Sequence, residues 1–285
     1  MAESTRDIKR RIRGISNTRQ ITKAMELVSS AKLRRAREQM EKSRPYYNTV
    51  YENIQNTLSN GKGIKHPYLE IRDVKNSLYI VITADRGLAG GFNSNIIRKV
   101  EHEIRDKKEN SHLITVGLKG REYFKRRDYN IVGEFVGMTE EPKFSHARDI
   151  GKIVMDMYKS GKVDEVNIFY TEFITTINQN IIKLKLLPNE EVKMDSEGKT
   201  SVVEFEPSPE EVLDYLIPKY IESIIYGALI ESSSSQQGAR RTAMESATDN
   251  ADEMIDELQL SYNRARQAAI TAEISEIVTG AEALK

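Results

Sequence analysis

The sequence predicts an α/β protein with a long antiparallel α-helical coiled coil, in which the N- and C-terminal helices form a shaft and the middle segment forms a small doubly wound α/β domain. Three observations lead to this prediction. The N-terminal region carries a narrow apolar stripe at helical spacing, the middle region alternates strand and helix patterns, and the 67 residues from Lys219 to Lys285 contain only three glycines and no proline. The expected domains are a shaft helix at 1–60, a linker at 61–75, an α/β domain at 76–207 and a second shaft helix at 208–285.

The N-terminal region is predicted to form one helix from about Thr5 to Leu58. Apolar or small residues mostly recur there by threes and fours, which is typical of a coiled-coil seam. The stripe contains Ile8, Ile12, Ile15, Thr22, Met25, Val28, Ala31, Ala36, Met40, Tyr47, Val50, Ile54 and Leu58. Pro45 removes one backbone hydrogen bond, so we expect it to bend this helix rather than end it.

The middle region changes to strand periodicity. Strands are expected at 77–83, 112–116, 130–135 and 165–173, with helices near 93–108, 119–127 and 145–160. This alternation predicts a mostly parallel sheet. Segments 179–188 and 201–206 flank the polar residues 191–199, which predicts a hairpin at the sheet edge.

The C-terminal region predicts one helix about 100 Å long, roughly twice the diameter of a compact protein of this length. Its apolar positions therefore need partners, and the N-terminal helix can cover only part of them. The run ESSSSQQGARR at 231–241 leaves an alternative open, a loop between two helices, because serine and glycine are poor helix formers. The segment TDN at 248–250 could likewise begin a new helix.

Charge is balanced over the whole chain but not within it. Lys and Arg together number 43, as do Asp and Glu, so the formal net charge is zero. Residues 1–44 hold thirteen basic and five acidic side chains, whereas residues 208–285 hold six basic and fourteen acidic ones. The two ends are therefore expected to attract each other. The sequence has no signal-peptide pattern and no run of eighteen apolar residues, so we expect a soluble chain without a membrane span of its own.

The residues predict no catalytic, cofactor or metal site. Cysteine is absent, and the four histidines show no metal-ligand spacing and are expected at the surface: His66, His102, His112 and His146. DRGLAGGFN at 85–93 lies between a strand and a helix, where nucleotide-binding folds hold phosphate. Its glycines match neither G-x-G-x-x-G nor a P-loop, so a tight turn or a protein contact is favoured over a phosphate site in a nucleotide-binding enzyme.

The basic N-terminal helix leaves two partners open. Its Arg and Lys side chains could contact nucleic-acid phosphates, or they could pair with acidic groups of the C-terminal helix or of another protein. Because the C-terminal region already offers neutralising charge, we expect no nucleic-acid partner.

The C-terminal end of the chain stays apolar although chain ends are normally polar. Ile270, Ile274, Ile277 and Val278 recur there at three- and four-residue spacing, which indicates a surface that another protein covers. On spacing alone, the neighbouring Arg266 and Gln267 are expected to be solvated surface residues.

Three segments resemble the gamma subunit of the bacterial F-type ATP synthase: QITKAMELVSSAKLRRAR at 20–37, DRGLAGGFN at 85–93 and GARRTAMESATDNADEMIDELQLSYNRARQAAITAEISEIVTGAEAL at 238–284. The resemblance covers the whole chain and is dense at both termini. It implies a noncatalytic rotor subunit without a cofactor, whose shaft lies in a ring of three alpha and three beta subunits. The α/β domain would join the epsilon subunit and the membrane c-ring, whose proton-driven rotation the shaft would transmit to the catalytic beta subunits.

The resemblance also implies roles for single residues. Contacts with beta subunits are expected at Lys23, Met25, Lys32, Arg34, Arg35, Arg86, Ala89, Arg266 and Gln267. Ile270, Ile274, Ile277 and Val278 would turn in the bearing, and Phe205, Glu206 and Pro207 would contact the c-ring or epsilon. Redox control through a cysteine pair cannot operate in this chain. The expected location is the cytoplasmic face of a bacterial cell membrane, as a peripheral subunit.

Overall fold

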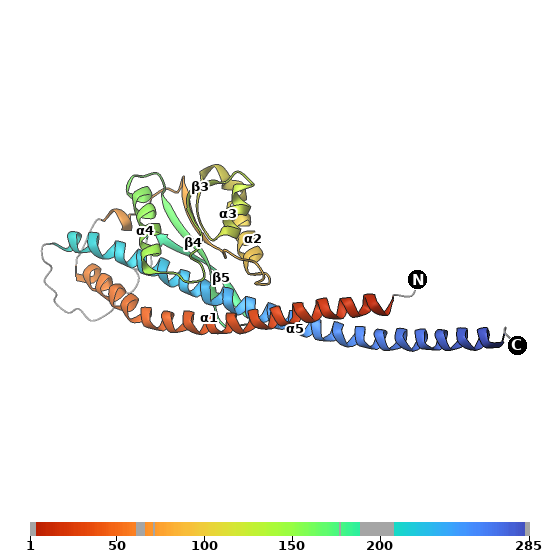
Figure 1. Cartoon of the computed structure of the whole chain (residues 1–285). Coiled ribbons are helices and arrows are strands. Elements are labelled where there is room, and N and C mark those ends of the chain that lie inside the picture. Colours follow the sequence, from red (N-terminus) through yellow and green to blue (C-terminus); the bar gives the residue numbers. More distant parts are fainter. Residues whose placement is uncertain (1–3, 61–65, 71, 177, 189–207, 283–285) are drawn as a thin grey trace. The chain divides into compact units, whose positions relative to one another are not determined.

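A computed structural model describes residues 4–60, 66–70, 72–176, 178–188 and 208–282 (Figure 1). The chain divides into two compact units. The end unit combines Met1–Val28 with Arg241–Lys285, and the sheet unit spans Ser29–Arg240. The expected domain boundaries stay a prediction.

Two long helices confirm the expected coiled-coil elements. Helix α1 spans Thr5–Asn60 with Pro45 inside it, and helix α5 spans Pro209–Glu282 with Pro218 inside it. Helix α5 runs without a break through 231–241 and 248–250. The alternative of a loop or a new helix start in that region is therefore wrong. Within the described part of the chain, neither these helices nor any other combines the length and apolar character needed to cross a membrane.

The sheet unit contains the expected mostly parallel sheet, with strand order β3-β2-β1-β4-β5. The strands are β1 (Ser77–Ile82), β2 (Ser111–Val116), β3 (Asn130–Phe135), β4 (Glu165–Phe173) and β5 (Gln179–Leu187). The first four strands pair in parallel, and β5 pairs antiparallel with β4 at the edge. The expected turn at 191–199 and strand at 201–206 lie outside the described residues.

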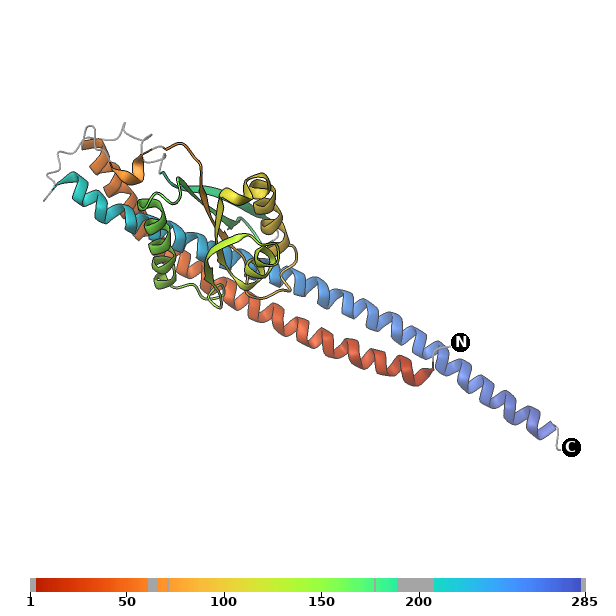
Figure 2. The same cartoon turned by 90° about the horizontal axis from the view of Figure 1, so that it is seen from above.

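Helices cover both faces of this sheet, which explains why every residue of β1 is buried. The helices are α2 (Phe92–Ile104), α3 (Leu118–Lys125) and α4 (Phe144–Lys159), with short 3-10 helices η1 (Pro67–Leu69) and η2 (Arg105–Asn110). Tyr79 and Val81 contribute to one core cluster together with residues of α2 and α3. Ile80 and Ile82 contribute to the other, with residues of α4 and α5. Figure 2 shows α5 running beside the sheet in the sheet unit.

The seam of α1 differs from the predicted stripe in its middle. Thr22, Glu26 and Ser29 are buried, followed by Leu33 and Ala36. These positions keep strict three- and four-residue steps, so the seam passes through polar residues. Val28 is instead 55% exposed, and Ala31 is also exposed. The predicted stripe was wrong here because it followed apolar residues across a shift of register.

His66 is a second correction. Its side chain is buried rather than at the surface. Nδ1 accepts a hydrogen bond from the Tyr68 backbone N–H, and Nε2 lies 3.5 Å from an Asp214 carboxylate oxygen. The ring therefore has a structural role at the start of η1.

Candidate functional site

In the end unit, two contacts fix the antiparallel register of α1 and α5. The hydroxyl oxygens of Thr22 and Thr248 lie 2.8 Å apart, and Arg19 Nε lies 2.5 Å from Asp252 Oδ1. Because the two helices are antiparallel, each residue earlier on α1 lies beside a residue later on α5. By this register Thr5 lies level with about Arg266. The later residues of α5 therefore have no described neighbour on α1.

The resulting free end of α5 is an apolar tip, which we define as Ile270, Ile274, Ile277 and Val278. Their side chains are 48%, 57%, 66% and 53% exposed. At 1.5 Å per residue, the helix continues for roughly 24 Å past the start of α1. Both views of the end unit show α5 extending beyond α1 (Figures 1 and 2). Arg266 and Gln267 are exposed where this free end begins. The structure thus presents a row of apolar side chains to a partner.

The outer surface of α1 in the end unit combines apolar and basic residues. Ile21 and Leu27 are each 61% exposed, and neither was expected as a surface feature. Lys23 Nζ lies 3.0 Å from a Glu26 carboxylate oxygen, while its side chain remains 56% exposed. Met25 is half-buried beside them. This surface can contact both apolar and acidic groups of another protein.

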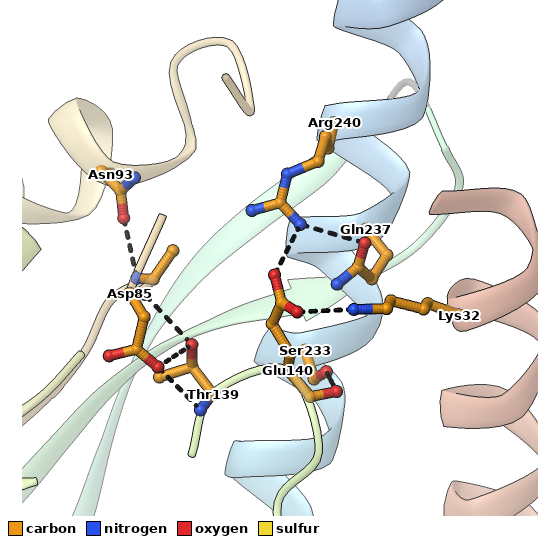
Figure 3. A network of polar contacts seen from close by, with 9 residues as sticks. Lys32, Asp85, Asn93, Thr139, Glu140, Ser233, Gln237 and Arg240 are labelled. Atoms are coloured by element: carbon orange, nitrogen blue, oxygen red, sulfur yellow. Dashed lines mark hydrogen bonds and ion pairs between the residues drawn. The ribbon is translucent and has the colours of Figure 1, made fainter. Parts of the chain in front are cut away.

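In the sheet unit, the carboxylate of Glu140 joins three elements (Figure 3). Lys32 Nζ on α1 lies 2.6 Å from Glu140 Oε2, and Arg240 Nη1 on α5 lies 3.5 Å from Glu140 Oε1. Arg240 Nη1 also donates to Gln237 Oε1 at 3.0 Å. Burial alone would raise the pKa of Glu140, but the hydrogen bond and charge of Lys32, with the charges of Arg240 and Arg86, lower it. Glu140 therefore stays ionised and holds both long helices to the loop after β3.

The turn after β1 is built around a second carboxylate, Asp85. It accepts hydrogen bonds from the backbone N–H groups of Leu118, Gly137 and Thr139 and from the Thr139 hydroxyl, at 2.8 to 3.1 Å. Burial would raise the pKa of Asp85, but these hydrogen bonds lower it. The anionic Asp85 carboxylate thus occupies these hydrogen-bond donors at the carboxyl end of the sheet. Its negative charge would repel a phosphate group placed there.

The turn after β1 has an exposed part and a buried part. Arg86 is exposed, and Leu88 is 63% exposed. Ala89 is buried and packs with Ala84 and Phe92 in a cluster that Ala239 of α5 contacts. The turn is therefore held against α5, and Arg86 and Leu88 are its accessible side chains.

The serine-rich run of α5 binds the end of β4. Thr171 lies beyond Phe169, the last residue of β4 that pairs with β1. Its N–H donates to Ser232 Oγ at 3.1 Å, and its carbonyl accepts from Ser235 Oγ at 3.0 Å. A Cβ on Gly238 would lie 3.1 Å from the Phe173 ring, so glycine allows the helix to approach the strand. Poor helix formers are present because they make these contacts.

The other expected contact residues are exposed or lie outside the described residues. Arg34 Nε lies 3.1 Å from Glu38 Oε1 on the same helix, and Arg35 is exposed. Phe205, Glu206 and Pro207 lie outside the described residues. The structure brings Lys32 and Arg86 to the same carboxylate, whereas Lys23, Met25, Arg266 and Gln267 belong to the end unit. The sequence analysis did not single out Glu140 or Arg240, because the residues that Glu140 pairs with lie about a hundred positions away in the chain.

Comparison with known proteins gives consistent relatives over the whole chain. A family model described as ATP synthase matches residues 4–284. The ATP synthase gamma chain of Alkaliphilus metalliredigens is 55% identical, with 100% of both chains covered. The Acetobacterium woodii protein named ATP synthase gamma chain, sodium ion specific, is 50% identical, again with 100% of both covered.

Solved structures agree with this fold. A chain of the central stalk and c-ring of the Tetrahymena thermophila mitochondrial ATP synthase aligns with a TM-score of 0.62 and 26% identity, covering 80% of this chain and 99% of that one. A chain of the Euglena gracilis mitochondrial ATP synthase aligns with a TM-score of 0.69 and 20% identity, covering 98% and 94%.

Proposed function

This chain belongs to the ATP synthase family, in which its relatives are gamma chains, and we propose on that premise that it is the rotor shaft of an F-type ATP synthase. As a noncatalytic subunit, it transmits torque between an ion-driven membrane ring and the catalytic subunits, and makes no bond itself. The observation that carries this proposal is the apolar tip of α5, which extends beyond its partner helix and requires a surrounding protein.

The partners follow from this role. Three alpha and three beta subunits surround the shaft, and the apolar tip lies in the bearing that they form. The epsilon subunit and the c-ring contact the α/β domain, and Phe205, Glu206 and Pro207 are the proposed contact residues. The assembled complex lies at the cytoplasmic face of the cell membrane, where this chain is peripheral.

Coupling requires that each orientation of the shaft favours one conformation of a beta subunit over another. The chain offers different surfaces around its helices for this purpose. Beta-subunit contacts are made by Lys23 and Met25 on α1, by Arg266 and Gln267 on α5, and by Lys32, Arg34, Arg35 and Arg86 in the sheet unit. Since Ala89 is buried, its part is to hold the turn that presents Arg86.

The coupling ion has two candidates. We propose protons, and the sodium-specific name of the Acetobacterium woodii relative makes sodium the second candidate. ATP hydrolysis by the whole membrane complex separates them. Stimulation by sodium chloride but not by potassium chloride at fixed pH would identify sodium, whereas equal rates would support protons.

The central test is assembly of the chain with the alpha and beta subunits of its own organism. We expect a complex of three alpha subunits, three beta subunits and one copy of this chain. Its ATPase activity should depend on the chain, and a bead attached to the chain should rotate during ATP hydrolysis. If folded alpha and beta subunits assemble and hydrolyse ATP equally well without the chain, the rotor role is wrong.

A paired substitution tests the proposed contacts at the base of the tip. Changing Arg266 and Gln267 together to alanine is expected to reduce ATP-driven rotation and ATP synthesis without changing the helical content of the chain. Asn263 and Arg264, which are exposed one turn earlier on α5, provide the matched control when changed in the same way. Equal losses in both variants would contradict a specific role for Arg266 and Gln267.

A further inference from the structure

The sheet unit contains a cavity of about 790 Å³ between α1, α4 and α5, beside β4 and β5. This volume lies within the range of sites for small organic molecules. Its apolar lining is contributed mainly by Met40, Tyr46, Phe144, Tyr170, Leu184 and Tyr226. None of the rotor contacts proposed above uses these side chains.

Two aromatic rings of the lining, those of Tyr46 and Tyr226, pack against the ring of Phe144. The Tyr46 and Phe144 rings are 6.1 Å apart with planes at 90°, and the Phe144 and Tyr226 rings are 5.5 Å apart with planes at 76°. The Tyr226 hydroxyl accepts a hydrogen bond from Gln39 Nε2 at 2.7 Å, which holds that ring in place. Rings turned in this way can present negative π faces to a cation from more than one side.

A carboxylate lies in the wall of the same cavity. Glu231 lines it from α5, and the nearby backbone of Phe173 lowers its pKa. Burial, and then the nearby charge of Glu172, raise the pKa of Glu231 to about 7. A bound positive charge would offset both effects and favour the ionised carboxylate.

Among the described residues that line the cavity, the remaining charged groups leave it net negative. Glu41 and Lys42 line it from α1, and both residues are exposed. With Glu231 ionised, the lining carries two carboxylates and one ammonium group. An anion would therefore meet repulsion there, whereas a cation would compensate the charge of the ionised Glu231.

We propose that this cavity binds an amphipathic organic cation, a quaternary or protonated amine carried on an aromatic or short aliphatic body. The cationic head lies against the rings of Tyr46, Phe144 and Tyr226 and within reach of Glu231, and the apolar body fills the space beside Met40 and Leu184. The inference does not depend on the rotor role.

The test uses two probes of the same shape, benzyltrimethylammonium and its neutral isostere neopentylbenzene. Binding to the full chain is measured by titration calorimetry, and the rise of the melting temperature is measured in parallel. We expect the cation to bind at least about tenfold more tightly than the neutral probe, since both probes offer the same apolar contact and differ in charge. Equal affinities, or no binding of the cation at millimolar concentration, would overturn the proposal.

Variants locate the site. Phe144→Leu keeps an apolar side chain but removes the central ring, and should weaken cation binding by about tenfold. Glu231→Gln should remove the increase in cation affinity that the intact chain shows between about pH 6 and 8, whereas Glu41→Gln at the rim should retain it. Because a quaternary ammonium does not titrate, the pH dependence reports on the protein. Binding unchanged by both Phe144→Leu and Glu231→Gln, in variants with normal circular dichroism, would place the cation elsewhere and refute the site.

Discussion

Replacing Glu140 by glutamine is expected to lower the free energy of unfolding of this chain by about 2 to 3 kcal/mol. The side chain of Arg240 is only 6% exposed and would lose its charged partner. At 3.5 Å and an effective dielectric constant of about 20, the gross attraction is about 5 kcal/mol, part of which desolvation already offsets. Lys32 is 30% exposed, so water can solvate it more readily.

Urea unfolding followed by circular dichroism measures this loss. The neighbouring Glu141 is exposed and provides a matched control, since Glu141→Gln should change the free energy of unfolding by no more than about 0.5 kcal/mol. Adding Arg240→Gln to Glu140→Gln should recover part of the loss, because the buried charge is then removed. Equal, small losses for Glu140→Gln and Glu141→Gln would refute the argument.

The pH dependence of the same difference has a defined sign. The pKa of Glu140 is lowered in the folded chain, so its contribution is fully present above the pKa of an unfolded glutamate. It is lost as pH falls through the lower folded value. The stability difference between the intact chain and Glu140→Gln should therefore shrink on acidification.

Three further groups of substitutions have expected outcomes. Glu231→Gln should stabilise the chain by about 1 to 2 kcal/mol at pH 8 and little at pH 4.5, as urea titrations at both pH values would show. The pKa of Glu231 is raised to about 7 in the folded chain, so keeping this carboxyl ionised becomes increasingly costly as pH rises from about 4.5 to 7. Partial exposure reduces the full value of this cost. Gly238→Val should destabilise the chain by about 2 kcal/mol, because the new side chain would overlap with Phe173. Gly227→Val should not have this effect, because a Cβ there meets nothing within 4 Å. Thermal unfolding of both variants makes the comparison. Valine at Thr22 or Thr248 should cost about 1 kcal/mol, and the double variant less than the sum, in a double-mutant cycle.

Local patterns predicted most of the fold. The expected strands at 130–135 and 165–173 match β3 and β4, because β-branched and aromatic residues, which favour strands, are concentrated in both segments. The exposed tip of α5 was also predictable, since no other segment of the chain could reach that far along a helix of this length. These features depend on residues close together in the sequence.

Features that depend on distant partners were less accessible. A regular stripe through Met25 and Val28 gave no sign that Glu26 and Ser29 would enter the seam instead, because the register of α1 is set by contacts with α5. Glu140 looked like any loop carboxylate until Lys32 and Arg240, each about a hundred residues away, were placed beside it. In both cases tertiary contacts decide which polar groups are buried.

The serines of α5 have a mechanical consequence. Successive residues of a helix point about 100° apart around its axis, and the side chains of Ser232 and Ser233 bind different parts of the sheet unit. Ser232 accepts from Thr171 on β4, whereas Ser233 donates to the Glu140 carbonyl after β3. Rolling α5 about its own axis would lengthen these bonds. A twist applied to this segment of α5 is therefore carried into the sheet as rotation of the whole sheet unit, rather than being lost as slip between helix and strand.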